Sequence, residues 1–145
     1  MKIVLASDHA GFAYKELLKA VLAERGHAVL DAGAHSTDPV DYPDFIGAAA
    51  KMVQAGQAQA GVVFGGSGNG EAMAANRFHG VRAAVAWDRD SARLGKQHNN
   101  ANVLSIGQRM VPQEELVPIV DAWLDATFEQ GRHLARLEKL ELLGP

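Results

Sequence analysis

The stretch Gly61-Val62-Val63-Phe64-Gly65-Gly66-Ser67-Gly68-Asn69-Gly70-Glu71 lies near the middle of the chain and decides which fold the rest can form. Its first four residues lack the polar alternation of a half-exposed strand, which is typical of a strand buried on both faces. A glycine-rich loop follows at once and leads into a short helix over 71–78. A buried strand that passes through such a loop into a helix is typical of a parallel α/β sheet.

Four further apolar stretches alternate with helical segments on either side of this loop. We expect strands over 4–7, 28–30, 61–64, 81–87 and 103–106, and helices over 14–25, 41–55, 71–78, 89–97, 112–128 and 132–143. This order predicts an α/β fold, a Rossmann-like three-layer sandwich in which helices flank a five-stranded parallel sheet. No repeat, low-complexity tract or linker interrupts it, so we expect a single domain over 1–145.

The composition limits the classes of protein to which the chain can belong. Its 145 residues are 48% hydrophobic and 21% charged, which excludes intrinsic disorder, and no apolar run is long enough for a membrane span. The absence of cysteine excludes a disulfide framework, a thiolate metal site and a cysteine nucleophile. The net charge of −3 argues against a nucleic-acid surface, and no local spacing of metal ligands is present. We expect a soluble cytoplasmic protein without a secretory signal.

The sequence of the glycine loop does not match three familiar motifs. In the dinucleotide-binding pattern Gly-x-Gly-x-x-Gly, Glu71 or Met73 stands where the third glycine is required. The phosphate loop of nucleotide-binding proteins needs a Gly-Lys-Ser/Thr that is absent, and the nucleophile elbow Gly-x-Ser-x-Gly has Asn69 in place of its last glycine. The loop is then either a cradle whose backbone N–H groups approach an anion or oxyanion, or a tight strand-to-helix connection.

Two polar side chains beside this loop have both a chemical and a structural interpretation. Glu71, in the first turn of the helix, is either a carboxylate base next to an oxyanion cradle or a partner of the helix dipole. Ser67 either donates its hydroxyl to the same substrate or caps the helix. The helix N-terminus should lower the pKa of Glu71 and weaken it as a base, whereas burial would raise that pKa.

Other polar loops should gather at the same edge of the sheet. Asp8-His9 follows the first strand and Gln108-Arg109 follows the last, and ligands of parallel sheets bind beyond the carboxyl ends of the strands. The alternative for Asp8 is a cap of the next helix. His98-Asn99-Asn100 precedes the strand over 103–106 and therefore belongs to the opposite edge, about 16 Å away along a five-residue strand. Either a second subunit brings these residues to the site, or they form a polar helix end.

The last helix carries Arg132 and Arg136 four residues apart and therefore on one face, with His133 beside them. No carboxylate stands four residues before either arginine, so an ion pair within the helix does not explain them. Paired guanidinium groups suit phosphate recognition, and a solvated basic face is the alternative.

These motifs occur together and in order along about residues 1–142. They are Ser7-Asp8-His9-Ala10-Gly11, Asp41-Tyr42-Pro43-Asp44, Gly65-Gly66-Ser67-Gly68-Asn69-Gly70-Glu71, His98-Asn99-Asn100-Ala101-Asn102, and Gly131-Arg132-His133 with Arg136. In this combination the chain resembles the type B ribose-5-phosphate isomerases, a family shared with galactose-6-phosphate and allose-6-phosphate isomerases.

The resemblance implies an aldose–ketose isomerase of the pentose phosphate pathway that uses no metal and no cofactor. Family members interconvert ribose 5-phosphate and ribulose 5-phosphate through an enediolate. They form homodimers or dimers of dimers, with active sites built from two chains. One branch has a cysteine base at the position of Gly65, so its mechanism cannot apply here, and the other branch has a glutamate base at the position of Glu71.

The resemblance also assigns roles to individual residues. Glu71 would move the proton between C1 and C2 with help from Ser67, and His98 would open the furanose ring. Asp8 would assist at the ring oxygen or the sugar hydroxyls, and Asn99 would hold a hydroxyl. The backbone N–H groups of residues 66–70, among them those of Gly66, Gly68, Asn69 and Gly70, would stabilise the enediolate oxygen. The positions that match the phosphate site are His9, Arg109, Arg132 and Arg136, while Tyr42 would be a neighbour of the sugar.

Three alternative functions stay open. An isomerase of allose or galactose 6-phosphate is the first, because one extra carbon is weakly discriminated unless a contact blocks it. The second is a non-catalytic module that senses sugar phosphates, which would need the arginines but not Glu71 and His98 together. The third is a hydrolase with Ser67 as nucleophile, for which the elbow spacing is missing.

Overall fold

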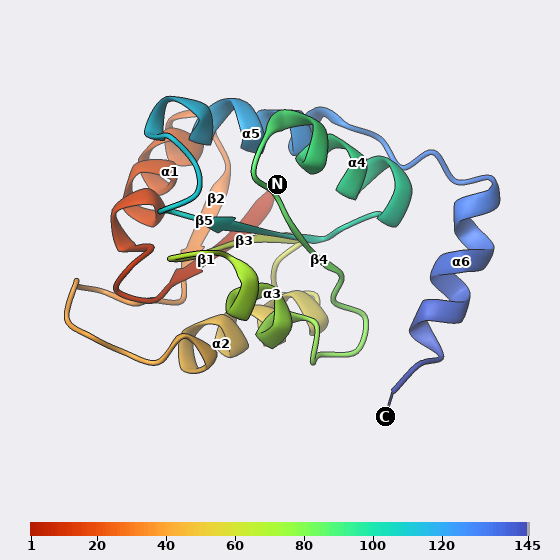
Figure 1. Cartoon of the computed structure of the whole chain (residues 1–145), viewed down its shortest axis with the longest axis horizontal. Coiled ribbons are helices and arrows are strands. Elements are labelled where there is room, and N and C mark those ends of the chain that lie inside the picture. The colour runs from red at the N-terminus through yellow and green to blue at the C-terminus, as the bar shows by residue number, and fades with distance from the viewer. Residues whose placement is uncertain (145) are drawn as a thin grey trace.

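The parallel sheet expected from the apolar stretches is present in the computed structural model, which describes residues 1–144 (Figure 1). Its strands are β1 (Lys2–Ser7), β2 (Ala28–Asp31), β3 (Ala60–Gly65), β4 (Ala83–Val85) and β5 (Val103–Gly107). Its helices are α1 (Phe12–Glu24), α2 (Tyr42–Gln54), α3 (Asn69–Ala75), α4 (Arg89–Asn99), α5 (Gln113–Asp125) and α6 (Arg132–Glu141). Within residues 1–144, no helix has the length and apolar character needed to cross a membrane.

The order of the strands sends neighbouring connections to opposite faces of the sheet. All neighbouring strands are parallel, in the order β2-β1-β3-β5-β4. Helices α1, α4 and α5 cover one face of the sheet, and α2 and α3 cover the other (Figure 1). β1 and β5 therefore lead to helices on one face, whereas β3, between them, leads to α3 on the other. Ligands of parallel sheets bind beyond the carboxyl ends of the strands at a point of this kind, and the three layers confirm the Rossmann-like prediction.

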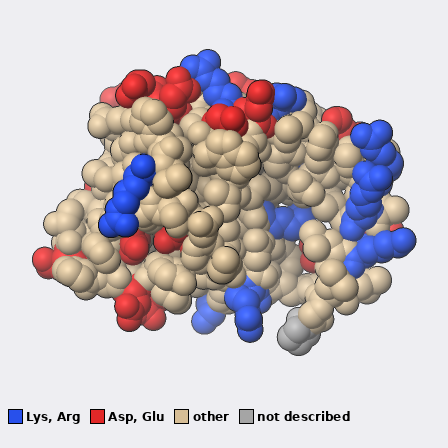
Figure 2. Space-filling model, viewed as in Figure 1, with Lys and Arg blue, Asp and Glu red and all other residues tan. Residues whose placement is uncertain are grey.

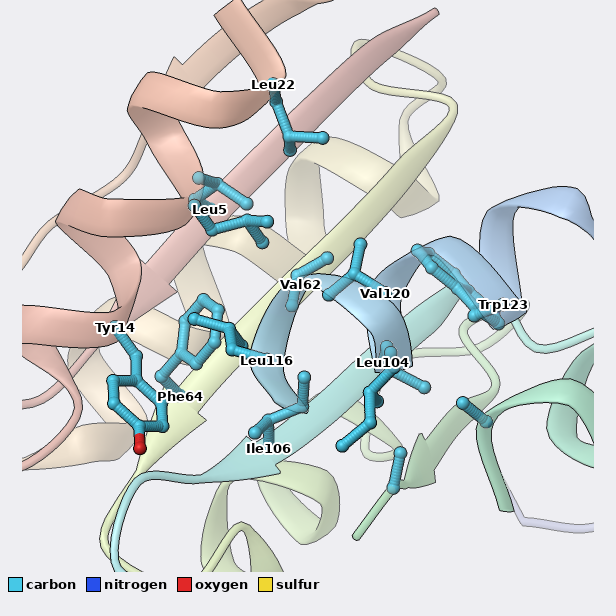
Figure 3. Close-up of a cluster of buried hydrophobic side chains, with 14 of the residues drawn as sticks. Leu5, Tyr14, Leu22, Val62, Phe64, Leu104, Ile106, Leu116, Val120 and Trp123 are labelled. Atoms are coloured by element: carbon cyan, nitrogen blue, oxygen red, sulfur yellow. The ribbon is translucent and has the colours of Figure 1, made fainter. Parts of the chain in front are cut away.

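Alternate side chains of the central strands fill a separate core on each face of the sheet. On the face covered by α1 and α5, Leu5 and Phe64 are fully buried in a cluster that includes Trp123 (Figure 3). On the other face, their neighbours Val4 and Val63 belong to a second buried cluster. Each large apolar side chain contributes about 1.5–3 kcal/mol on burial, so the two cores hold the strand ends firmly in place.

Four elements end at least two residues earlier than the sequence pattern predicts: β4, α3, α5 and α6. α3 covers Asn69–Ala75 rather than 71–78, and α6 ends at Glu141 rather than at 143. β4 covers only Ala83–Val85 rather than 81–87, because the Asp88 side chain already caps α4 by accepting a hydrogen bond from a backbone N–H of its first turn. α5 ends at Asp125, three residues before the expected end, because Ala126 is extended and begins the connection to α6. α1 and α3 also begin two residues earlier than expected, which shortens the loops after β1 and β3.

A buried ion pair joins α1 to the end of β2. The Lys15 side chain is fully buried, and its Nζ lies 2.7 Å from Asp31 Oδ1 and 3.0 Å from Glu16 Oε1. Burial raises the pKa of Asp31, but hydrogen bonds from Lys15, Lys19 and the Gly33 N–H outweigh burial and lower that pKa to about 2. Asp31 therefore neutralises an ammonium group that water does not reach.

Acid should weaken the fold through Asp31. Its pKa in the folded chain lies below the usual 3.8, so its contribution is complete above about pH 4 and is lost as the pH falls towards 2. We expect a loss of about 1–2 kcal/mol after solvent screening, and a cost of about 2–4 kcal/mol for Asp31→Asn at pH 7. Urea unfolding at several pH values measures both quantities. Asp121→Asn, at the exposed pair with Arg25, is the control and should cost less than about 1 kcal/mol. Equal costs for the two variants would contradict this account.

Candidate active site

The loops that follow β1, β3 and β5 meet at one edge of the sheet and are joined by backbone hydrogen bonds. The Asp8 N–H donates to the Phe64 carbonyl (3.3 Å), and the Gln108 N–H donates to the Gly65 carbonyl (2.8 Å). The Arg109 N–H likewise donates to the Gly66 carbonyl (3.0 Å). The structure thus brings together the three loops that the sequence analysis placed at this edge, and the glycine loop is fixed from both sides.

The glycine loop turns sharply before α3. Gly68 precedes the helix with a φ of +86°, a left-handed conformation that residues with side chains rarely adopt. Its carbonyl accepts a hydrogen bond from the buried Ser105 hydroxyl (2.7 Å). The Ser67 hydroxyl accepts one from the Asn69 N–H (3.2 Å), so Ser67 supports the turn while its side chain stays exposed beside the loop.

Glu71 is a buried carboxylate in the first turn of α3. It is only 4% exposed, and its Oε2 has no hydrogen-bond partner among the residues that the structure describes. Burial raises the pKa of Glu71, and the negative charge of Asp8 raises it further, while the backbone N–H groups of Glu71 and Gly68 act in the opposite direction. Burial therefore outweighs the helix N-terminus, which makes the carboxylate a stronger base than its position in the helix alone would allow.

The Glu71 carboxylate occupies the space that a side chain at position 65 would need. A Cβ built on Gly65 would lie 1.8 Å from Glu71 Oε1 and 2.1 Å from its Cδ. Only a glycine at residue 65 leaves room for the Glu71 carboxylate where it is observed. A cysteine base at 65 and the present position of Glu71 exclude each other sterically.

Gly65→Ala should displace the Glu71 carboxylate and reduce any reaction that depends on it. We expect kcat to fall by about 10²-fold, the cost of misplacing a catalytic group by about 1 Å. Gly47→Ala in α2 is the matched control, because a Cβ there would lie 3.7 Å from Phe78, an ordinary contact. Circular dichroism and thermal unfolding of both variants report whether the fold is intact. Full activity of a folded Gly65→Ala protein would contradict this account of the pocket.

Asp8 and His9 continue the site from the end of β1. Asp8 is buried, and its Oδ1 accepts a hydrogen bond from the Gly11 N–H (3.1 Å), so it caps the turn into α1 and also acts on Glu71 through its charge. His9 Nδ1 accepts a hydrogen bond from the Val40 N–H (3.1 Å). This contact places the proton of the neutral imidazole on Nε2, where it can be donated to an anion.

Arg109 and Tyr42 stand against the backbone of the glycine loop. A Cβ at Gly66 would lie 2.8 Å from Arg109 Nη1, and a Cβ at Gly70 would lie 2.6 Å from Tyr42 Cζ. A guanidinium group and a phenol ring therefore approach the loop more closely than side chains on it would permit. A cation at this distance suits a bound phosphate or a developing negative charge.

Four of the expected site residues lie at the opposite edge of the sheet: His98, Asn99, Arg132 and Arg136. β3 and β5 are paired in register from Gly61–Val103 to Gly65–Gly107. The glycine loop follows the end of β3, whereas α4 ends just before the start of β5. The two are therefore separated by the length of a strand, about 16 Å. α6 projects beyond α4 at this end (Figure 1), and basic side chains gather along it (Figure 2). One chain does not bring these residues to Glu71.

His98 belongs to a cluster that the sequence analysis did not find. Its ring stacks on that of His133 with centroids 4.6 Å apart, and its Nε2 lies 3.5 Å from Glu129 Oε1. Burial lowers the pKa of His133, and the positive charges of His98 and Arg132 lower it further. The neutral form of His133 is therefore favoured, although the negative charge of Glu129 acts in the opposite direction on the pKa of His133.

Arg82 ties the end of α4 to the end of α6. Its guanidinium donates to the carbonyls of Asn99 and Asn100 (3.1 Å each), which a helix end leaves without partners, and its Nη1 lies 2.7 Å from Glu141 Oε1. Arg82 thereby holds the segment with His98 and Asn99 against the helix with the paired arginines. No motif in the sequence signals this role.

Comparison with known proteins places this arrangement in a family. The profile of the family described as Ribose/Galactose Isomerase matches residues 3–140. The chain belongs to this family. It is similar to Ribose-5-phosphate isomerase B of Escherichia coli K12, with 43% identity over 139 residues, which are 96% of this chain and 93% of the relative. It is also similar to the protein of the same name from Mycolicibacterium paratuberculosis, with 44% identity over 142 residues, which are 97% of this chain and 89% of the relative.

Solved structures of the family share the fold. Ribose-5-phosphate isomerase B of Clostridium thermocellum superimposes with a TM-score of 0.96 at 42% identity, over 97% of this chain and 95% of the other. The enzyme of that name from Mycoplasma genitalium, solved with bound ribulose-5-phosphate, gives a TM-score of 0.93 at 39% identity, over 97% of this chain and 93% of the other. The family predicted from the five motifs is thus confirmed.

Proposed function

We propose that this chain interconverts D-ribose 5-phosphate and D-ribulose 5-phosphate through ring opening and an enediolate intermediate. The observation that carries the proposal is the buried Glu71 carboxylate, whose Oε2 lacks a hydrogen-bond partner among the described residues, beside a loop of backbone donors. Relatives at 43% and 44% identity are named Ribose-5-phosphate isomerase B, and one structural relative was solved with ribulose-5-phosphate.

The chemistry follows from the groups around Glu71. Its carboxylate takes the proton from C2 of the open-chain aldose and returns it to C1. The proton of the O2 hydroxyl passes to O1, with Ser67 as a relay, so that the carbonyl moves from C1 to C2. The enediolate oxygen that forms on the way is stabilised by backbone N–H groups, those of Gly66, Gly68, Asn69 and Gly70. Asp8 and Ser67 hydrogen-bond the sugar oxygens. His9 and Arg109 bind the phosphate and turn its binding energy into the alignment of C1 and C2.

A second copy of the chain supplies the other half of each site. In a homodimer, or a dimer of dimers, His98 of the partner subunit opens the ring and Asn99 of the partner subunit holds a hydroxyl. The partner's Arg132 and the partner's Arg136 complete the phosphate site. The position of these four residues at the far edge of the same chain supports this arrangement. So do the exposed apolar side chains on and just after α6: Leu134, Leu140, Leu142 and Leu143.

The test is turnover of ribose 5-phosphate by the purified chain in an excess of chelator, followed as formation of the ketose. We expect conversion to equilibrium without added metal or cofactor. Allose 6-phosphate and galactose 6-phosphate are assayed beside it, and a larger kcat/KM for either would move the proposal to a hexose-phosphate isomerase. Binding of all three sugars without turnover would support the sensing module instead. We also propose that the protein carries out this reaction in the cytoplasm.

A further inference from the structure

The cluster around His98 has the composition of a metal site. His98 comes from the end of α4, Glu129 from the segment between α5 and α6, and His133 from the first turn of α6. One ligand atom from each of the three side chains lies within 4.8 Å of the other two, and the His98–Glu129 pair is already at 3.5 Å. Two imidazoles and one carboxylate are the donors of open zinc sites, in which water or a ligand fills the fourth position.

The three side chains can close around an ion with small movements. Bonds of about 2.0–2.1 Å in a tetrahedral site place neighbouring donor atoms roughly 3.3 Å apart. The donor atoms lie within 4.8 Å of one another, so the widest pair has to approach by about 1.5 Å at most. The side chains of His98 and Glu129 are 39% and 46% exposed, which leaves them free to rotate and open to an ion from solvent. The backbone of Glu129 is meanwhile fixed, because its N–H donates to the Gln97 carbonyl (3.0 Å). The stacked rings have to tilt, which is the main structural cost.

We propose that His98, Glu129 and His133 bind one Zn²⁺ per chain, and that the bound ion withholds His98 from the sugar and so inhibits the enzyme reversibly. The inhibitory part rests on the proposed function, whereas the binding part does not. Arg132 and Arg136 lie close enough to act on His133, and their positive charge weakens the binding of a dication. Nitrogen donors favour zinc over the hard ions Mg²⁺ and Ca²⁺, which prefer oxygen.

The binding part is tested by titration of the metal-free protein with ZnCl₂ in competition with a chromogenic zinc indicator. We expect one ion per chain, no displacement by millimolar Mg²⁺, and an affinity at least about tenfold lower for His133→Gln and for Glu129→Gln. His79→Gln is the control, because His79 also stands near a carboxylate, 3.9 Å from Glu141, but no third ligand within residues 1–144 completes a site there. Wild-type affinity in both cluster variants, or a loss confined to His79→Gln, would overturn the site.

The inhibitory part is tested by adding zinc during turnover of ribose 5-phosphate and then removing it with chelator. We expect activity to fall over the same zinc range in which the site fills and to return fully, while each cluster variant, compared with its own metal-free rate, needs about tenfold more zinc. Zinc that fills the site without slowing turnover would overturn the inhibition. Absence of turnover in chelator alone would instead contradict the proposed function. It would not change the conclusion of the binding titration, which does not depend on turnover.

Discussion

Glu71→Gln should abolish isomerisation while the protein still binds the sugar phosphate. The amide has nearly the shape of the carboxylate but cannot accept the proton from carbon, so we expect kcat to fall by about 10²–10⁴-fold. KM or the dissociation constant should change little, because phosphate recognition lies in other residues. Steady-state kinetics of the ketose formed and calorimetric binding of ribose 5-phosphate measure the two effects separately.

The stability of the same variant is its internal control. Because the pKa of Glu71 is raised in the folded chain, ionisation opposes folding at every pH above the usual value, and the neutral amide removes that cost. Glu71→Gln should therefore unfold at or above the wild-type temperature at pH 7, so loss of turnover cannot be attributed to loss of the fold. Ser67→Ala, by comparison, should retain part of the activity, whereas a serine hydrolase would lose all of it. Unchanged kcat in Glu71→Gln would remove the base from the mechanism.

The sheet, and the edge of it where the loops after β1, β3 and β5 meet, could be predicted because local sequence patterns determine them. Each buried strand is a short apolar run, and the loop from Gly65 to Glu71 follows its strand directly in the sequence. Parallel topology then brings the ends of β1, β3 and β5 to one edge without further information. The same topology places His98 at the far edge, so the division of the expected site into two halves was also accessible from the sequence.

Features that depend on packing could not be predicted. The pKa of Glu71 reflects two opposed effects, and only the burial of its side chain shows that desolvation is the larger. Its fit against Gly65 depends on a rotamer that no sequence motif encodes. Glu129 and His133 stand about thirty positions after His98, and they meet it only because the segment after α5 returns along α4. Contacts of this kind are set by tertiary structure, so a search for local ligand spacing overlooks them.

Mixing two inactive variants should restore activity if each site takes residues from two chains. In a heterodimer of Glu71→Gln with His98→Ala, one site carries both defects, and the other combines an intact Glu71 with an intact His98. Random exchange at equal amounts makes half of the dimers mixed, each with one working site, so about a quarter of the wild-type activity should return. Exchange of differently tagged chains is verified by pull-down before the assay.

The control mixture pairs Glu71→Gln with Gly65→Ala, since both changes affect the half of the site that one chain provides on its own. Every site in that mixture has a damaged or displaced base, so no activity should return above the sum of the two parents. If the mixture with His98→Ala also stays inactive after verified exchange, His98 does not act in trans. The segment at the end of α4 would then have to move by about a strand length to reach its own glycine loop. The paired register of β3 and β5 and the anchoring of that segment by Arg82 oppose such a movement, which is why we expect the mixed sites to work.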